Sequence, residues 1–99
     1  MPRKIEWSPR AIQEWTKILK YWVKRNKSYE YSLKLDRLFV EKFDIIINSP
    51  DTGTKTDFTM VRIKIIHHNK IYYRIYPEKI EILAIWDTRR NPKKFKLQK

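Results

Sequence analysis

Cysteine is absent from the chain, and glycine occurs only once. Without cysteine there is no disulfide framework and no thiolate metal site. A single glycine also excludes the glycine-rich loops that bind phosphate groups in nucleotide-binding proteins. No apolar run approaches the roughly 20 residues of a membrane-spanning helix, and the opening stretch MPRKIEW lacks the apolar segment of a signal peptide. We therefore expect a cytoplasmic protein with no membrane partner.

Acidic residues are also scarce. The chain has 23 Lys and Arg against 11 Asp and Glu, which gives a formal net charge of +12 on 99 residues. The few carboxylates lie mostly beside basic residues, as Glu30 does near Lys34, so a hydrolase with paired carboxylates is not indicated. A charge this positive favours a polyanionic partner such as RNA, DNA or an acidic protein, although some small proteins are simply basic.

The residues that are present suffice for one small domain with a hydrophobic core, since 41% are hydrophobic and 14% aromatic. We expect a single domain over residues 1–99 with a basic C-terminal tail over about 91–99. Ser8 and Pro9 are typical of a helix start, and steps of three and four between apolar residues predict a helix ending near 25–27. A second helix is expected from a cap at Ser28 until Pro50.

After residue 57 the apolar residues alternate with a period of two. Segments 58–66, 71–76 and 80–87 are expected strands, separated by turns at 67–70 and 77–79, and residues 4–7 form a further short strand. The fold class is therefore α+β: a short N-terminal strand and a helical hairpin packed on an antiparallel β-meander, in the order β-α-α-β-β-β.

The first strand of the meander carries two cations on one face. Alternation puts Val61, Ile63 and Ile65 on the expected core face, and Arg62 and Lys64 together on the opposite one, about 6–7 Å apart. Cations in this pattern can stabilise the extra negative charge of a phosphate attacked by an RNA 2′-hydroxyl. They are also common on surface strands for solubility.

Candidate general bases for such a reaction are few. They are Lys64, His67 and His68. The two histidines lie in a predicted turn, where exposed residues without chemistry are common, and adjacent side chains point apart, so a joint metal site is not expected. Tyr72 and the other strand tyrosines either stack on bases or simply pack.

Several short motifs occur along the chain in an order that resembles a known protein family. WSPRA opens the first helix, IINSPDTG follows the second, and VRIKI, YYRIY and IEILAIWDTRRNP follow in turn. Over Ile5 to Phe95 this order resembles the RelE/ParE superfamily, the toxins of type II toxin–antitoxin systems. The resemblance implies two helices against a curved antiparallel sheet, and a cognate antitoxin that wraps the toxin in a hetero-oligomer.

The resemblance also implies site residues. The pair of RelE-like lysines two positions apart falls on Arg62 and Lys64, and the arginine of the next strand falls on Lys70. The RelE-like C-terminal tyrosine has no match, and Phe95 is the nearest ring. The catalytic residues expected are Arg62, Lys64, Arg89 and Arg90. The substrate-binding residues expected are Lys70, Tyr72, Arg74, Lys93, Lys94 and Phe95.

Three functions remain open at this stage. RelE-like members enter the ribosome and cut mRNA, which makes a metal-independent endoribonuclease, or mRNA interferase, the preferred hypothesis, with no cofactor expected. ParE-like members inhibit DNA gyrase without nuclease activity, and the missing tyrosine favours this alternative. A non-catalytic, basic nucleic-acid-binding module is the third.

Overall fold

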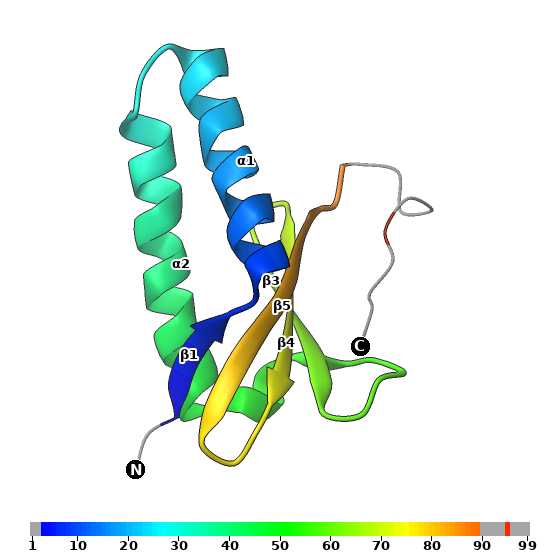
Figure 1. Ribbon diagram of the computed structural model, residues 1–99. Helices are drawn as coiled ribbons and strands as arrows, with labels where there is room; N and C mark the ends of the chain where they lie inside the picture. Colours follow the sequence, from blue (N-terminus) through cyan, green and yellow to red (C-terminus); the bar gives the residue numbers. More distant parts are fainter. Residues whose placement is uncertain (1–2, 90–94, 96–99) are drawn as a thin grey trace.

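A computed structural model describes residues 3–89 and residue 95, and it shows one layer of helices against one sheet (Figure 1). The elements are β1 (Lys4–Trp7), α1 (Pro9–Asn26), α2 (Glu30–Asn48), the 3-10 turn η1 (Pro50–Thr52), β2 (Thr54–Lys55), β3 (Val61–Ile66), β4 (Asn69–Ile75) and β5 (Lys79–Asp87). The α+β class and the predicted order are confirmed. The loop after α2 adds η1 and the two-residue strand β2.

The helix boundaries follow from local hydrogen bonds. The Ser8 hydroxyl accepts from the amide of Ala11 at 3.0 Å, and α1 ends where Lys27 adopts a left-handed conformation with φ of 51°. The predicted cap at Ser28 is wrong by one residue. Tyr29 occupies the cap position of α2, while the Ser28 hydroxyl accepts from the amide of Glu30 at 3.2 Å.

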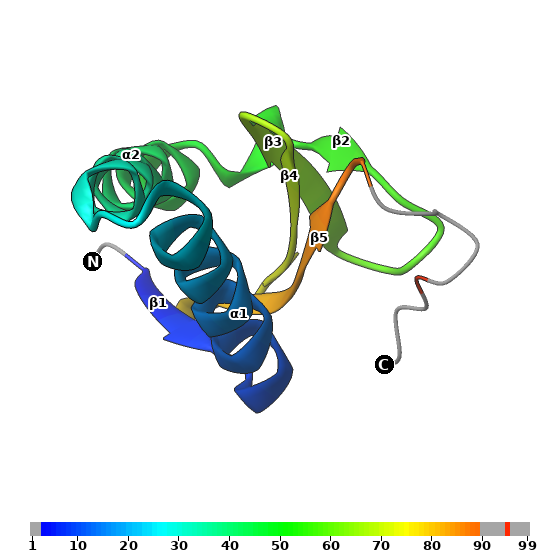
Figure 2. The same cartoon turned by 90° about the horizontal axis from the view of Figure 1, so that it is seen from above.

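The five strands lie in the order β1-β5-β4-β3-β2, and both helices cover one face of the curved sheet (Figure 2). β1 pairs parallel with β5, and the other pairs are antiparallel. β5 is therefore a central strand, as its apolar character on both faces indicates. We call the face under the helices the inner face and the opposite face the outer face.

β3 is placed differently from the prediction. It begins at Val61, because Met60 takes a positive φ of 61° that ends the extended run. Its register pairs Arg62 with Tyr73 and Lys64 with Ile71, and Tyr73 and Ile71 belong to the core under the helices. Arg62 and Lys64 therefore lie on the inner face, and Ile65 on the outer face is 58% exposed. The prediction of a core face at Val61, Ile63 and Ile65 was therefore wrong, although Val61 itself is buried, because alternation cannot tell which side the helices cover.

A bulge between Tyr72 and Tyr73 also changes the last strand. It sets Tyr72 opposite Ala84 and Tyr73 opposite Ile82, which leaves Leu83 as the extra residue. Ile85 therefore joins the inner core, whereas simple alternation assigns it to the other face.

The core is aromatic between the helices and aliphatic on the sheet. The rings of Trp15 and Phe39 stack with centroids 3.7 Å apart. Tyr73 is fully buried, and its hydroxyl donates to the carbonyl of Pro50 at 2.7 Å, which fastens η1 to the sheet. No helix in the described part of the chain has the length and apolar character needed to cross a membrane.

Candidate functional site

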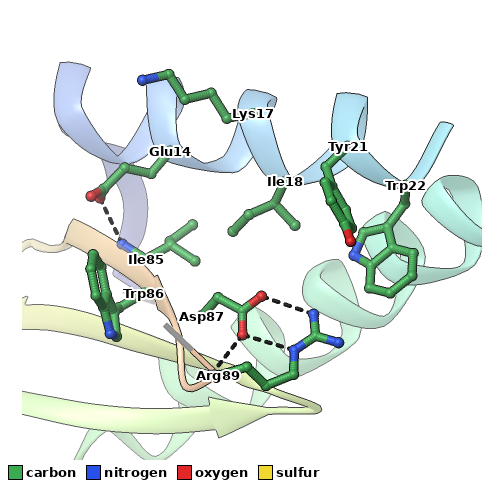
Figure 3. Close-up of a pocket in the computed structure, with 9 residues that line it drawn as sticks. All are labelled: Glu14, Lys17, Ile18, Tyr21, Trp22, Ile85, Trp86, Asp87 and Arg89. Carbon is green, nitrogen blue, oxygen red and sulfur yellow. Dashed lines mark hydrogen bonds and ion pairs between the residues drawn. The ribbon is translucent and has the colours of Figure 1, made fainter. Parts of the chain in front are cut away.

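A groove lies between α1 and the end of β5 (Figure 3). It encloses about 740 Å³ and is lined by Glu14, Lys17, Ile18, Tyr21, Trp22, Ile85, Trp86, Asp87 and Arg89. The groove exists because β1 pairs only with Lys79–Ile82, so that α1 alone faces the rest of β5. We call it the α1–β5 groove.

Side chains from α1 and its N-cap satisfy the strand edge that β1 leaves uncovered. The Ile85 amide donates to the Glu14 carboxylate at 2.9 Å, and the Ser8 hydroxyl donates to the Leu83 carbonyl at 2.9 Å. Glu14 also pairs with Arg10 at 3.2 Å. A carboxylate thus replaces a neighbouring strand at this edge, which fixes the angle of α1 against β5.

Arg89 is held at the end of the α1–β5 groove (Figure 3). Its guanidinium donates to both carboxylate oxygens of Asp87, with Nη2 2.8 Å from Oδ2 and Nε 3.0 Å from Oδ1. This hydrogen bond lowers the pKa of Asp87 from its ordinary value, and burial opposes the shift only in part. The guanidinium carbon lies 5.3 Å from the centroid of the Trp22 ring. Asp87 therefore holds Arg89 in place.

Arg62 is bound to the loop before it. Its Nη1 donates to the carbonyls of Gly53 at 2.8 Å and Asp51 at 3.0 Å, and its Nη2 lies 3.7 Å from the Asp51 carboxylate. Lys64, two residues later, is half-buried on the same face, and no hydrogen bond or ion pair joins its ammonium group to another described side chain or carbonyl. Arg62 therefore has the contacts of a structural residue.

The predicted substrate-binding residues do come together, but on the outer face. The sheet register aligns Lys70, Tyr72 and Arg74 along one side of β4. Phe95 stacks on Tyr72 with centroids 4.6 Å apart and lies 5.2 Å from the Trp86 ring. Burial raises the pKa of Tyr72. Among the described residues, the Nε of Arg74 is buried and has no hydrogen-bond partner.

Arg10, on α1, also lies beside the rings on the outer face. Its guanidinium carbon lies 5.0 Å from the centroid of the Phe95 ring. We call Arg10, Tyr72, Arg74, Trp86 and Phe95 the outer aromatic cluster. Cations beside flat rings can bind bases and phosphates, so the cluster can contact a nucleic acid.

The remaining predicted residues stand apart from both surfaces. His67 and His68 form the exposed two-residue turn between β3 and β4, while Asn69 and Lys70, also expected there, belong to β4. Within the described part of the chain, no group of His, Asp or Glu is placed to hold a metal ion. Arg90, Lys93 and Lys94 lie outside the described residues.

Arg62 and Arg89, two of the predicted catalytic cations, are not brought to one point. Arg62 is level with Tyr73, and Asp87, next to Arg89, is level with Asn69. Tyr73 and Asn69 are four residues apart on β4, and β3 and β5 are two strand spacings apart. The Arg62 and Asp87 backbones are therefore about 16 Å apart. The Arg62 guanidinium is turned to η1 and the Arg89 guanidinium to Asp87, so the two groups do not face a common phosphate.

Sequence reasoning missed Arg10 and Glu14, although one signal was available. Glu14 lies between Ala11, Trp15 and Ile18 at helical spacing, so it shares the apolar side of α1. A carboxylate at such a position needs a buried partner, and the Ile85 amide is that partner.

Comparison with known proteins identifies the family and the fold. The family model described as the ParE toxin of type II toxin–antitoxin system, parDE, matches residues 5–92. No curated protein matches the sequence. Among solved structures, the fold is similar to the chromosomal ParDE TA system from P. aeruginosa, with a TM-score of 0.68 and 20% sequence identity over 84% of this chain and 92% of that chain. Because the family model spans nearly the whole chain, this chain belongs to the ParE family of type II toxin–antitoxin toxins.

Proposed function

We propose that this toxin arrests growth by inhibiting DNA gyrase and does not cut mRNA. The observation that carries the proposal is the separation of the expected cleavage residues Arg62, Lys64 and Arg89. Cleavage through the 2′-hydroxyl requires cations that converge on one phosphate, because their benefit falls with distance from the developing charge. Here both arginines are engaged with protein oxygens, and the Arg62 backbone lies about 16 Å from the backbone of Asp87, which holds Arg89.

The α1–β5 groove supports a binding role. It offers the rings of Tyr21, Trp22 and Trp86 beside the charges of Lys17 and Arg89. Aromatic residues and arginine are the residue types that contribute most to protein–protein binding. The groove is therefore the surface that we assign to the target protein, with Arg89 at its rim.

We also propose an antitoxin partner that forms a hetero-oligomer with the toxin. The family match supports a paired antitoxin, and the net charge of +12 favours an acidic one. Arg90, Lys93 and Lys94 contribute to this charge and stay predictions as binding residues.

One feature favours mRNA cleavage as a second candidate. The outer aromatic cluster combines stacked rings with the cations Arg10 and Arg74, as RNA-binding surfaces do. Lys70 lies on the same side of β4. Phe95 stands near Tyr72, but its ring has no hydroxyl to donate a proton, so the cluster supports binding better than catalysis.

The two candidates separate in parallel assays on the same purified toxin. We expect inhibition of supercoiling by gyrase, or accumulation of cleaved DNA, and intact mRNA in a ribosome-programmed translation reaction. Supercoiling that proceeds normally while mRNA is cut within codons would establish the nuclease instead. The Arg89→Ala variant should weaken gyrase inhibition, and Lys55→Ala, an exposed cation on β2, is its matched control.

A further inference from the structure

The two helices differ in charge although they pack side by side. α1 has five cations and one acid, whereas α2 has three cations and four acids. The acid of α1, Glu14, is already engaged by the Arg10 guanidinium and by the Ile85 amide. The remaining cations of α1 therefore have no acid of their own helix to neutralise them.

Four exposed lysines lie along one face of α1 at steps of three, four and three residues: Lys17, Lys20, Lys24 and, at the C-cap, Lys27. Such steps place side chains above one another on a helix. This face is opposite the side on which Trp15 is buried. No acidic side chain of the described residues forms an ion pair with these lysines. We call them the lysine stripe.

Two ordinary explanations account for only part of the stripe. Cations in the last turn of a helix stabilise its dipole, but Lys17 and Lys20 lie more than a turn before the end of α1. Lysine also keeps protein surfaces soluble, but the cations of α2, also a surface helix, are interspersed with acids. The alignment of like charges on α1 therefore has the pattern of a surface that binds an anion.

The chemistry of the stripe favours phosphate groups over a protein partner. Protein–protein interfaces are depleted of lysine and have apolar residues at their centre, and the lysine stripe contains none. From Lys17 to Lys27 the stripe is about 15 Å long. Over that length a DNA duplex presents about nine phosphate charges. Lys17 also lines the α1–β5 groove, so the stripe borders the surface assigned to the target protein.

We propose that the lysine stripe binds the phosphate backbone of duplex DNA. The ammonium groups donate to phosphate oxygens, so binding does not depend on the base sequence. The choice of duplex DNA among polyanions rests on the proposed function, because gyrase acts on duplex DNA. A toxin that uses both surfaces contacts the enzyme through the α1–β5 groove and the DNA through the stripe.

The test measures binding of the purified full-length toxin to a fluorescent duplex of 20 base pairs by anisotropy, without gyrase. Each phosphate contact adds about −0.9 to the slope of log K against log salt. The triple variant Lys17→Gln, Lys20→Gln, Lys24→Gln should therefore reduce the steepness of the slope by about 3 and bind at least tenfold more weakly at 100 mM salt. Glutamine has a helix propensity close to that of lysine, so circular dichroism should show unchanged helix content.

A matched variant removes the same charge from α2: Lys34→Gln, Arg37→Gln, Lys42→Gln. It should keep the slope of the parent to within about 1. The single variant Lys20→Glu should bind the duplex at least threefold more weakly, and it tests the stripe should the triple variant lose helix content.

Three results overturn the proposal. They are equal losses in the two triple variants, which assign binding to net charge alone; no binding of the parent to the duplex at 50 mM salt; and tighter binding of a single-stranded RNA of the same length. Duplex binding that depends on the stripe, in a toxin that leaves supercoiling by gyrase unaffected, supports this proposal and refutes only gyrase inhibition.

Discussion

Replacing Arg62 by alanine separates a structural role from a catalytic one. The side chain is 18% exposed and donates to two carbonyls, those of Gly53 and Asp51. Hydrogen bonds from a charged donor each contribute about 1.5–3 kcal/mol when buried. The Asp51 carboxylate is 85% exposed, so its ion pair at 3.7 Å adds little. Because the Asp51 carbonyl is also near solvent, we expect a loss of about 2–3 kcal/mol in the free energy of unfolding.

For a domain of this size, each kcal/mol corresponds to about 4–8 °C in the melting temperature. Arg62→Ala should therefore melt about 10–20 °C lower in a circular-dichroism scan, and the urea midpoint should fall with an unchanged slope. Arg62→Lys should lie between the variant and the parent, since an ammonium cannot span both carbonyls. Lys64→Ala is the matched control on the same strand, and its melting temperature should change by less than about 4 °C.

The result that refutes this reasoning is specific. If Arg62→Ala melts like the parent protein and yet loses toxicity completely, Arg62 acts on a substrate, and the loop contacts are incidental. Toxicity should be scored at a temperature well below the melting point of the variant, because partial unfolding also lowers activity.

Three further predictions rest on other contacts. In Gly53→Ala the new Cβ collides with the Tyr73 hydroxyl and lies 2.9 Å from the Ile63 carbonyl oxygen, so unfolding in urea should show a loss of about 2–3 kcal/mol, against no loss for the exposed neighbour Thr54→Ala. The pKa of Asp87 is lowered in the folded state, so its contribution is present above the unfolded pKa and is lost as pH falls through the lower folded value; the parent and Asp87→Asn should differ in melting temperature at pH 6, and the difference should begin to shrink only as pH falls below about 3.8. Arg89→Ala should weaken toxicity in a growth assay while the circular-dichroism spectrum stays unchanged, because Arg89 follows the last strand and is exposed; a variant that fails to fold would show that the Asp87 contact is structural.

Much of the architecture follows from periodicity. Steps of three and four residues predicted both helices to within a few residues, and alternation predicted β4 and β5 to within two residues. The same rule failed on β3, because a strand near the edge of the sheet exposes apolar residues such as Ile65 and carries Arg62 on the inner face. The bulge at Leu83 could not be predicted either, since an extra residue in one strand does not change the composition of the sequence.

The site was harder to predict than the fold for a related reason. Residues that share a motif need not share a face of the sheet. The predicted site residues lie partly on the inner face and partly on the outer face. Tyr72 and Arg74 share one side of their strand by alternation, which is local information, whereas Lys70, expected in the turn, joins them only because β4 begins at Asn69. Grouping Arg62 with Arg89 required the register of three strands, which depends on long-range pairing.

The short length of β1 connects the fold to the proposed binding surface. If β1 extended along the whole of β5, it would cover the Ile85 amide, and α1 would be held away from Trp86 and Asp87. Because Ser8 and Pro9 start α1 directly after Trp7, the strand ends early and Glu14 takes over the exposed edge. The same helix start therefore opens the α1–β5 groove and places Trp22 beside Arg89. A substitution that delays the helix, and so lengthens β1, should close the groove even though no residue that lines it is altered.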